Sequence, residues 1–278
     1  MNELHLYLYP CIVFTYVEKI LILDGDESFG FRFSKDYMSE YKIKILYPRP
    51  NLINFIDDIL SLNDEYDFII NNFEIDFYNK NSELLPLNSK IQEVINNKFK
   101  NGKKVFMSSQ FVYRSGDDKK DENYKIEPET AYGKTKCETE KKVMENNNYL
   151  IIRRGLTYGK CTYNIYTDIL AAIRSGIPLK MNDNIIINPL LNKDLSCLTE
   201  KIINDYNNEI FNMSSDEHMT LYCFGNKIYN SIRESNSNFI KIFYKNNLNY
   251  NMDNSKIKRK YSFKFSGLSD IDFLTFHR

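Results

Sequence analysis

The sequence predicts an α/β fold, in which a doubly wound parallel sheet is followed by a smaller C-terminal substrate-binding part. Short continuous apolar runs such as Lys19–Leu23 are typical of strands buried on both faces of a parallel sheet. Amphipathic segments alternate with these runs at the spacing of βαβ units. The length of 278 residues suits one large domain or two tightly joined ones.

The expected elements follow one another along the first half of the chain. A turn rich in glycine and acidic residues, Asp24–Gly30, follows the first strand and precedes a helix. Gly102 lies where a helix C-terminus is expected, just before the fourth strand. The other expected strands are 42–47, 66–70 and 104–107, and the other expected helices are 52–62 and 87–99.

The alternation becomes less regular beyond residue 155, where helices are expected near 166–175 and 195–205. We therefore predict a sheet-bearing domain over 19–155 and a smaller part over 156–278 that packs against it. The apolar stretch 6–17 is broken by Pro10, is too short to span a bilayer and lacks the positive charge that a signal peptide needs. Residues 1–18 are expected to form an N-terminal extension or an extra strand.

Charge and the supply of metal-binding residues argue against several classes of protein. Lys+Arg and Asp+Glu both number 37, so no overall field gathers nucleic acid or anionic lipid. The five cysteines form no C-x-x-C pair, and the three histidines show no metal-ligand spacing. We expect buried, reduced thiols in a cytoplasmic protein, with no metal, no nucleic-acid partner and no membrane association. The basic run 256–260 is interpreted as a solvated helix face, with contact to a substrate diphosphate or an anionic partner as the alternative.

One pair of residues carries a chemical signal. Tyr132 and Lys136 stand four apart on an expected helix that runs to about Glu145, so both project from one face. An ammonium beside a phenol favours the phenolate and makes the tyrosine a usable general acid or base near neutral pH. No other Tyr-x-x-x-Lys occurs in the chain, and Ser109 ends the strand that comes before this helix. Its hydroxyl could hold a carbonyl oxygen while Tyr132 transfers the proton.

The order of motifs around this pair resembles the extended short-chain dehydrogenase/reductases. Within them it is most similar to dTDP-4-dehydrorhamnose reductases and their sugar-nucleotide relatives. The resemblance covers most of the chain after residue 18 and is strongest over 104–159. The motifs are Ser108-Ser109-x-x-Val112-Tyr113, Pro128, Tyr132-Gly133-Lys134-x-Lys136, Ile151-Ile152-Arg153 and Tyr158-Gly159, with weaker matches at 67–71, Leu87-Asn88, Glu140, Asn188-Pro189 and Asp194.

The resemblance implies a Rossmann-type fold that binds NADP or NAD, and a nucleotide-linked 4-keto-6-deoxy sugar as substrate. Ser109, Tyr132 and Lys136 would be the catalytic residues, with Tyr132 protonating the C4 oxygen and Lys136 also holding the nicotinamide ribose. Arg49, a basic residue at the end of the second strand, favours NADP, with an ordinary surface arginine as an equal alternative. The cofactor-binding residues would be Gly25, Gly30, Arg49, Asn71, Tyr132 and Lys136.

The loop after the first strand departs from the family's Gly-x-x-Gly-x-x-Gly pattern. Counted back from Gly30, Asp24 and Glu27 stand where glycines belong, and counted from Gly25 the loop is one residue short. Glycines let the backbone approach a pyrophosphate at a helix N-terminus, whereas carboxylates repel it unless they point away. Two functions stay open: a sugar-nucleotide reductase, with a 4-epimerase or 4,6-dehydratase as close variants, and a non-catalytic regulatory or binding subunit. Both are compatible with a homodimer or a regulatory partner.

Overall fold

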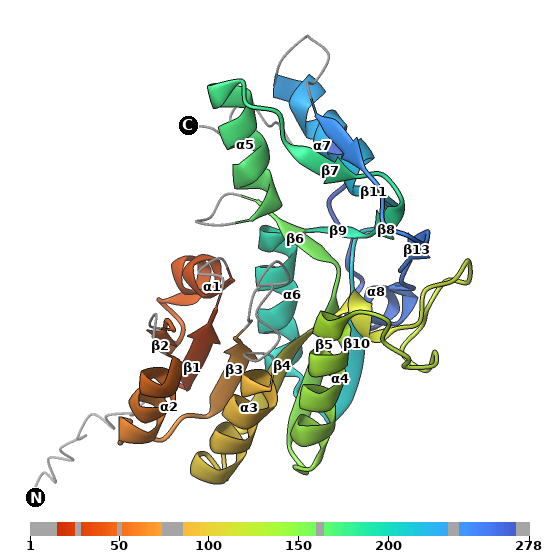
Figure 1. The fold of residues 1–278 in the computed structure, drawn as a ribbon. Coiled ribbons are helices and arrows are strands. Elements are labelled where there is room, and N and C mark those ends of the chain that lie inside the picture. Colours follow the sequence, from red (N-terminus) through yellow and green to blue (C-terminus); the bar gives the residue numbers. More distant parts are fainter. Residues whose placement is uncertain are drawn as a thin grey trace, which may run out of the picture.

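Six parallel strands form the central sheet of the computed structural model, which describes residues 16–25, 29–48, 52–73, 86–159, 164–232 and 239–270. Their order across the sheet is β10-β5-β4-β3-β1-β2 (Figure 1). Four of them are buried along almost their whole length, which explains their continuous apolar runs. The strands are β1 (Lys19–Asp24), β2 (Lys42–Leu46), β3 (Phe68–Asn72), β4 (Lys103–Ser109), β5 (Tyr149–Arg154) and β10 (Glu209–Met213).

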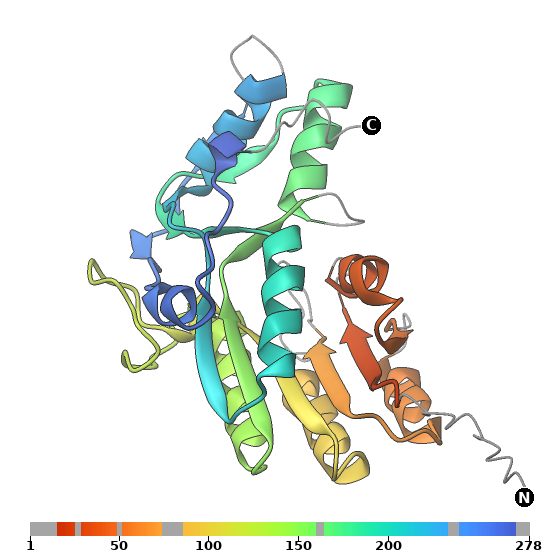
Figure 2. The same cartoon turned by 180° about the vertical axis from the view of Figure 1, so that it is seen from behind.

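Helices cover both faces of this sheet. On one face lie α2 (Leu52–Ser61), α3 (Leu87–Lys98) and α4 (Ala131–Met144) (Figure 1). Across the other face lies α6 (Asn192–Asn204) (Figure 2), with α1 (Phe29–Tyr37) packed beside it and α8 (Ser255–Tyr261) against β10. Successive side chains of β1 point to opposite faces of the sheet. Leu21 packs against α2 and α3 on one face, and Ile22 packs against α1 and α6 on the other. The predicted doubly wound parallel sheet is confirmed.

A second, smaller region lies beyond the carboxyl ends of the sheet strands (Figure 1). Its helices α5 (Ile165–Ser175) and α7 (Leu221–Ile232) share an apolar core with Met181 and Phe239. A capping box between Asn164 and Thr167 opens α5, and Gly176 closes it with φ 70°, a left-handed conformation that favours glycine. The short strands here are β6 (Leu156–Tyr158), β7 (Lys180–Asn182), β8 (Ile185–Ile187), β9 (Pro189–Leu191), β11 (Met219–Thr220), β12 (Ile240–Ile242) and β13 (Leu248–Asn249).

The bounds of the helices and strands expected from the sequence agree with those in the structure to within a few residues. The expected division into two parts at residue 155 does not follow the two regions of the structure as closely. Residues beyond 155 lie in both regions, because α6 and β10 belong to the layers of the large sheet. The division between 19–155 and 156–278 therefore stays a prediction. Residues 1–15, and with them most of the expected extension or extra strand, lie outside the described residues.

Candidate functional site

The carboxyl ends of β1 and β3 meet where the winding of the sheet reverses. From β1 the chain goes to β2 on one side, and from β2 it crosses to β3 on the other side of β1. In open parallel sheets, ligands bind outside the carboxyl ends of the strands at such a switch point. The smaller region lies at this same edge of the sheet (Figure 1). The residues at these strand ends therefore make up the candidate site.

Helix α4 lies close against the end of β4. It begins after Thr130, whose side chain accepts a hydrogen bond from the Gly133 amide at 2.9 Å. Gly133 faces the short 3-10 helix Gln110–Val112 that follows β4, and a Cβ at this glycine would overlap the carbonyl oxygen of Phe111. The close approach of α4 thus depends on the absence of a side chain at position 133.

We expect Gly133→Ala to destabilise the protein, although alanine favours helix interiors by about 1 kcal/mol over glycine. The added Cβ overlaps a backbone oxygen, so α4 must shift away from Phe111 at a cost of about 1–3 kcal/mol. Thermal unfolding measures this loss. Gly116→Ala is the matched control, because the nearest atom to a Cβ there, Tyr124 Oη, is 3.8 Å away. Equal stability of the two variants would contradict the overlap.

The ammonium of Lys136 is fully buried beside two aromatic rings. Its Nζ donates a hydrogen bond to the Met107 carbonyl oxygen at 2.9 Å and lies 5.0 Å from the centroid of Phe106 and 5.6 Å from that of Tyr132. Tyr132 is 9% exposed, and its ring meets Phe111 edge-on with centroids 6.0 Å apart. The structure therefore brings Tyr132 and Lys136 together on one face of α4, with a positive charge near the phenol ring.

Ser109 is the buried last residue of β4. Its Oγ accepts a hydrogen bond from the Phe111 amide at 3.3 Å, and the Phe111 ring contacts Tyr132. Two positions earlier in the same strand, the Met107 carbonyl holds Lys136. Ser109, Tyr132 and Lys136 thus gather at the same end of β4, and their catalytic role stays a prediction.

The side chain of Asp24 points towards the first turn of α1. It is fully buried, and its Oδ2 accepts a hydrogen bond from the Gly30 amide at 2.8 Å, while Oδ1 accepts one from Asn72 Nδ2 at 2.5 Å. The Gly25 amide donates to the Asn72 carbonyl oxygen at 3.2 Å. Of the two glycines predicted to bind a cofactor, Gly25 lies at the switch point and Gly30 is bonded to a carboxylate of the protein itself.

Asn71 joins the end of β3 to α3. Its Nδ2 donates to Gln92 Oε1 at 2.8 Å, and its Oδ1 accepts a hydrogen bond from the Phe73 amide at 3.1 Å. Both polar groups of this predicted cofactor-binding side chain are therefore engaged within the protein. Arg49, predicted to favour NADP, and the loop residues 26–28 lie outside the described residues.

The two sides of the switch point differ in how they fit a dinucleotide. On α3, which packs against α4, the buried amide of Asn88 lacks a hydrogen-bond partner for both its nitrogen and its oxygen among the described residues. A buried amide of this kind fits a polar ligand or water, while the contact of Tyr132 and Lys136 with a nicotinamide ribose stays a prediction. At the start of α1, the Gly30 amide is already bonded to Asp24, so this one amide is not available to a pyrophosphate.

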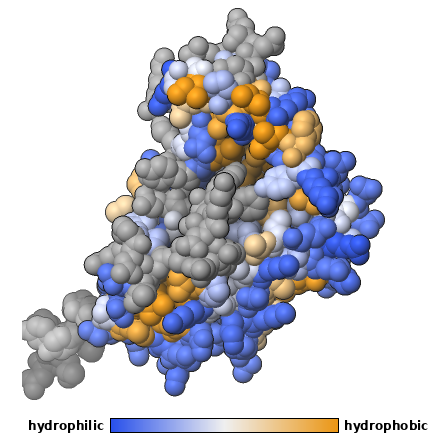
Figure 3. Space-filling view, viewed as in Figure 1, coloured by the Kyte–Doolittle hydropathy of each residue, from blue (hydrophilic) through white to orange (hydrophobic). Residues whose placement is uncertain are grey.

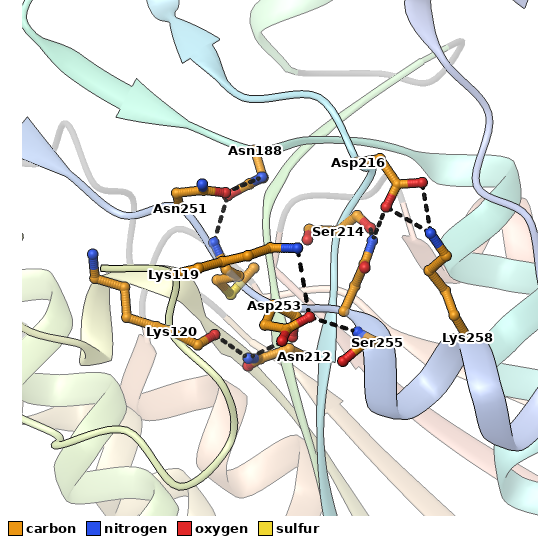
Figure 4. Close-up of polar contacts among 12 residues, drawn as sticks. Lys119, Lys120, Asn188, Asn212, Ser214, Asp216, Asn251, Asp253, Ser255 and Lys258 are labelled. Atoms are coloured by element: carbon orange, nitrogen blue, oxygen red, sulfur yellow. Dashed lines mark hydrogen bonds and ion pairs between the residues drawn. The ribbon is translucent and has the colours of Figure 1, made fainter. Parts of the chain in front are cut away.

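Two residues of the weaker family matches, Asn188 and Asp194, hold backbone segments together in this structure. The Asn188 amide donates to Gln110 Oε1 at 3.2 Å, and Asn188 Nδ2 donates to Asn251 Oδ1 at 3.2 Å (Figure 4). Asp194 accepts hydrogen bonds from the amide and the hydroxyl of Ser266 at 2.7 and 3.0 Å. Burial raises the pKa of the Asp194 carboxyl above its ordinary value.

The three lysines of the basic run 256–260 are paired with acidic groups of the protein. Lys256 and Lys260 approach the two Glu209 carboxylate oxygens to 3.4 and 2.5 Å, and Lys258 lies 2.8 Å from Asp216 Oδ2 (Figure 4). These pairs fix α8 to β10 and the segment after it, which supports the interpretation as a helix face rather than as a free anion site.

A fully buried ion pair joins α4 to β5. Arg153 Nη2 and Nε donate to the two Glu140 carboxylate oxygens at 2.8 and 3.0 Å, and the Ser108 hydroxyl donates to Oε1 at 2.5 Å. Arg153 Nη1 also donates to Tyr113 Oη at 3.0 Å. Although burial acts to lower it, the bonds to Glu140 raise the pKa of Arg153 above its ordinary value. Three residues of the family motifs, Tyr113, Glu140 and Arg153, thus form one structural network.

Sequence reasoning missed three residues of this region. Asn72 binds the Asp24 carboxylate, Gln110 accepts the Asn188 amide, and the Phe111 ring meets those of Tyr132 and Tyr250. Each follows a predicted site residue, Asn71 or Ser109, by one or two positions. Their position at or just after the end of a strand is the feature of the sequence that could have identified them.

Other features expected from composition can be compared with the described part of the chain. Within those ranges, no group of three or more His, Cys, Asp or Glu side chains is arranged to hold a metal ion. No helix there is long and apolar enough to cross a membrane. Side chains over α3 and α4 are mostly hydrophilic on the face in Figure 3.

The expectation of buried thiols is wrong for Cys223, which is exposed, while Cys137 and Cys197 are half-buried, and all three are free.

Comparison with solved structures identifies the fold. The dTDP-4-dehydrorhamnose reductase from Bacillus anthracis in complex with NADP superposes with a TM-score of 0.81 at 17% identity, covering 94% of this chain and 99% of that one. A dTDP-4-dehydrorhamnose reductase from Clostridium acetobutylicum gives 0.72 at 17% identity, covering 91% and 97%. The dTDP-glucose 4,6-dehydratase from Bacillus anthracis in complex with NAD gives 0.74 at 14% identity, covering 94% and 96%.

Comparison by sequence identifies the family. No curated protein matches the chain. The family model described as the RmlD substrate binding domain matches residues 96–255, which is more than half of the chain and includes α4 and the end of β4. The order of its motifs resembles that of the extended short-chain dehydrogenase/reductases, and the protein belongs to the RmlD substrate binding domain family.

Proposed function

We propose that the protein is an NAD(P)H-dependent reductase of a nucleotide-linked 4-keto-6-deoxy sugar. The observation that carries this proposal is the placement of Tyr132 and Lys136 on one face of α4, against the end of β4 where Ser109 lies. The family match and the fold shared with sugar-nucleotide reductases and a dehydratase support it.

The chemistry requires a hydride at the carbonyl carbon and a proton at the carbonyl oxygen. A bound nicotinamide would supply the hydride. The Tyr132 hydroxyl donates the proton to the C4 oxygen of the sugar, and the Ser109 hydroxyl donates a hydrogen bond to the same oxygen. The buried Lys136 ammonium, 5.6 Å from the Tyr132 ring centroid, stabilises the phenolate that remains. Tyr132 then regains a proton from water.

The direct test is turnover by the purified chain. A dTDP-linked 4-keto-6-deoxy sugar is added with NADPH or NADH, and both the oxidation of the nicotinamide and the mass of the sugar product are followed. We expect substrate-dependent oxidation with the gain of two hydrogens on the sugar. Binding of the cofactor without turnover of any 4-keto sugar nucleotide would overturn the proposal.

The contact between Asp24 and Gly30 favours a second candidate, a non-catalytic regulatory or binding subunit on the same fold. A protein of this kind needs no hydride donor, so a carboxylate that weakens cofactor binding at the start of α1 would not impair its function. It would co-purify with an enzyme and change that enzyme's kinetics. Cofactor-dependent turnover by the pure chain would exclude it.

A further inference from the structure

Phe111, in the 3-10 helix that follows β4, contacts Ser109 and the start of α4 through three different groups. Its amide donates a hydrogen bond to Ser109 Oγ at 3.3 Å. Its carbonyl oxygen lies where a Cβ at Gly133 would overlap it. Its ring meets the ring of Tyr132 edge-on, with centroids 6.0 Å apart and planes at 80°. One residue therefore touches both side chains that are proposed to act on the sugar carbonyl.

Each of these contacts orients a group that the proposed reaction uses. A serine hydroxyl that accepts a hydrogen bond from an amide keeps its own hydrogen for donation, so the Phe111 amide leaves Ser109 able to donate to a carbonyl oxygen. Edge-on contact favours one arrangement of two neighbouring rings. Because the Tyr132 side chain is only 9% exposed and Gly133 brings α4 close to Phe111, the Tyr132 ring has little room to turn.

Phe111 is itself held by a residue of the smaller region. The ring of Tyr250 meets that of Phe111 with centroids 4.8 Å apart and planes at 68°. Tyr250 is fully buried directly after β13, and its amide donates to the Ile186 carbonyl oxygen of β8 at 3.2 Å. Three rings, those of Tyr250, Phe111 and Tyr132, thus form a row that leads from the smaller region to the tyrosine of α4.

We propose that Phe111 is a positioning residue, which holds the Tyr132 ring and the Ser109 hydroxyl in the geometry for proton transfer. The inference rests on the proposed function for its reaction. Phe111 acts through these two side chains and not through contact with the reacting atoms. A displacement of a catalytic group by about 1 Å can lower the rate about 10²-fold, so a ring that keeps the proton donor in place has a large effect on turnover.

Phe111→Leu removes the ring and keeps an apolar side chain, together with the amide and the carbonyl of residue 111. We expect kcat with a 4-keto sugar nucleotide to fall by about 10–10²-fold, while KM for the sugar and for NADPH changes little. The solvent deuterium isotope effect on kcat should rise, because proton transfer becomes the slower step. Phe111→Tyr keeps the ring and should restore kcat to near that of the unaltered protein.

A second measurement needs neither substrate nor cofactor. Nuclear magnetic resonance of protein labelled with carbon-13 in its tyrosine rings reports how fast each ring turns, and comparison with Tyr132→Phe assigns the Tyr132 signals. We expect the Tyr132 ring to turn faster in Phe111→Leu than in the unaltered protein, because its edge-on neighbour is gone.

Phe239→Leu is the matched control. It removes a ring that meets Tyr229 edge-on, with centroids 5.4 Å apart, in the apolar core of α5 and α7. The loss of packing is similar there, so thermal stability should fall. The kcat, the isotope effect and the motion of the Tyr132 ring should all equal those of the unaltered protein.

Unchanged kcat and unchanged Tyr132 ring motion in Phe111→Leu would overturn the proposal. A loss that falls on KM alone would overturn it as well, since it would assign Phe111 to substrate binding. If Phe111→Leu does not fold, Tyr250→Leu takes its place, because it leaves Phe111 present and removes the ring behind it. The same changes are then expected to a smaller extent, and their absence would contradict the positioning role.

The outcomes separate this inference from the proposed function. Faster motion of the Tyr132 ring in Phe111→Leu, together with no reduction of any 4-keto sugar by the unaltered protein, would leave the hold on Tyr132 standing and remove the reductase. Turnover by the unaltered protein, with kcat and ring motion indifferent to Phe111, would do the reverse.

Discussion

Tyr132→Phe lowers kcat with a 4-keto sugar nucleotide by about 10²–10⁴-fold, the range that general acid catalysis contributes. The substitution removes only the hydroxyl, and the ring keeps its edge-on contact with Phe111. Binding of cofactor and sugar should therefore change little, so that the loss falls on kcat and not on KM. Steady-state kinetics with both parameters determined is the measurement.

Tyr244→Phe is the matched control for this prediction. Tyr244 is 52% exposed, and it lies in the smaller region after β12. The same change of one hydroxyl should leave kcat unaltered there. Near-normal turnover in Tyr132→Phe would show that another group donates the proton.

Arg153→Met is expected to lower the free energy of unfolding by about 3–5 kcal/mol, because it leaves the Glu140 carboxylate buried without its partner. The two side chains are each 1% exposed, so water cannot replace the lost bonds. The Tyr113 hydroxyl also loses its bond to the guanidinium. Urea denaturation followed by circular dichroism measures the change.

An exposed ion pair supplies the comparison for the buried one. Arg114 lies 3.7 Å from Glu127, and both side chains are about half exposed, so Arg114→Met should cost at most about 1 kcal/mol. A second comparison combines Arg153→Met with Glu140→Gln. Since the double variant buries no unpaired charge, it should be more stable than the sum of the single losses predicts. Equal effects of Arg153→Met and Arg114→Met would contradict the expected cost of leaving the Glu140 carboxylate buried without its partner.

The features that the sequence predicts correctly are those encoded by local pattern. β1 and β3 contain the continuous apolar runs 20–23 and 68–70 because both of their faces are covered, and such runs can be recognised without knowing which strands lie beside them. The meeting of Tyr132 and Lys136 follows from the helical repeat alone. The sequence shows that Gly133 belongs to the Tyr-Gly-Lys motif. It does not show why glycine is needed there, because the close contact with the Phe111 carbonyl oxygen involves a segment outside the helix.

The features that sequence reasoning could not predict depend on contacts between distant segments. Asp24 was expected to repel a phosphate unless it pointed away, and its direction is decided by Asn72, 48 positions further along. The engagement of Asn71 likewise depends on Gln92 of α3. The boundary near residue 155 was drawn where local alternation becomes irregular, and no local signal marks β10 as a strand of the large sheet.

The place of β10 at the edge of the sheet has a consequence during biosynthesis. β5 ends at Arg154 and pairs on its outer side with β10, which begins at Glu209. At about 5–20 residues per second, a ribosome leaves the β5 edge bare for several seconds. An uncovered strand edge is a template for pairing with other chains. A chain interrupted near residue 155 is therefore expected to aggregate, because the β5 edge is covered only after β10 has been synthesised.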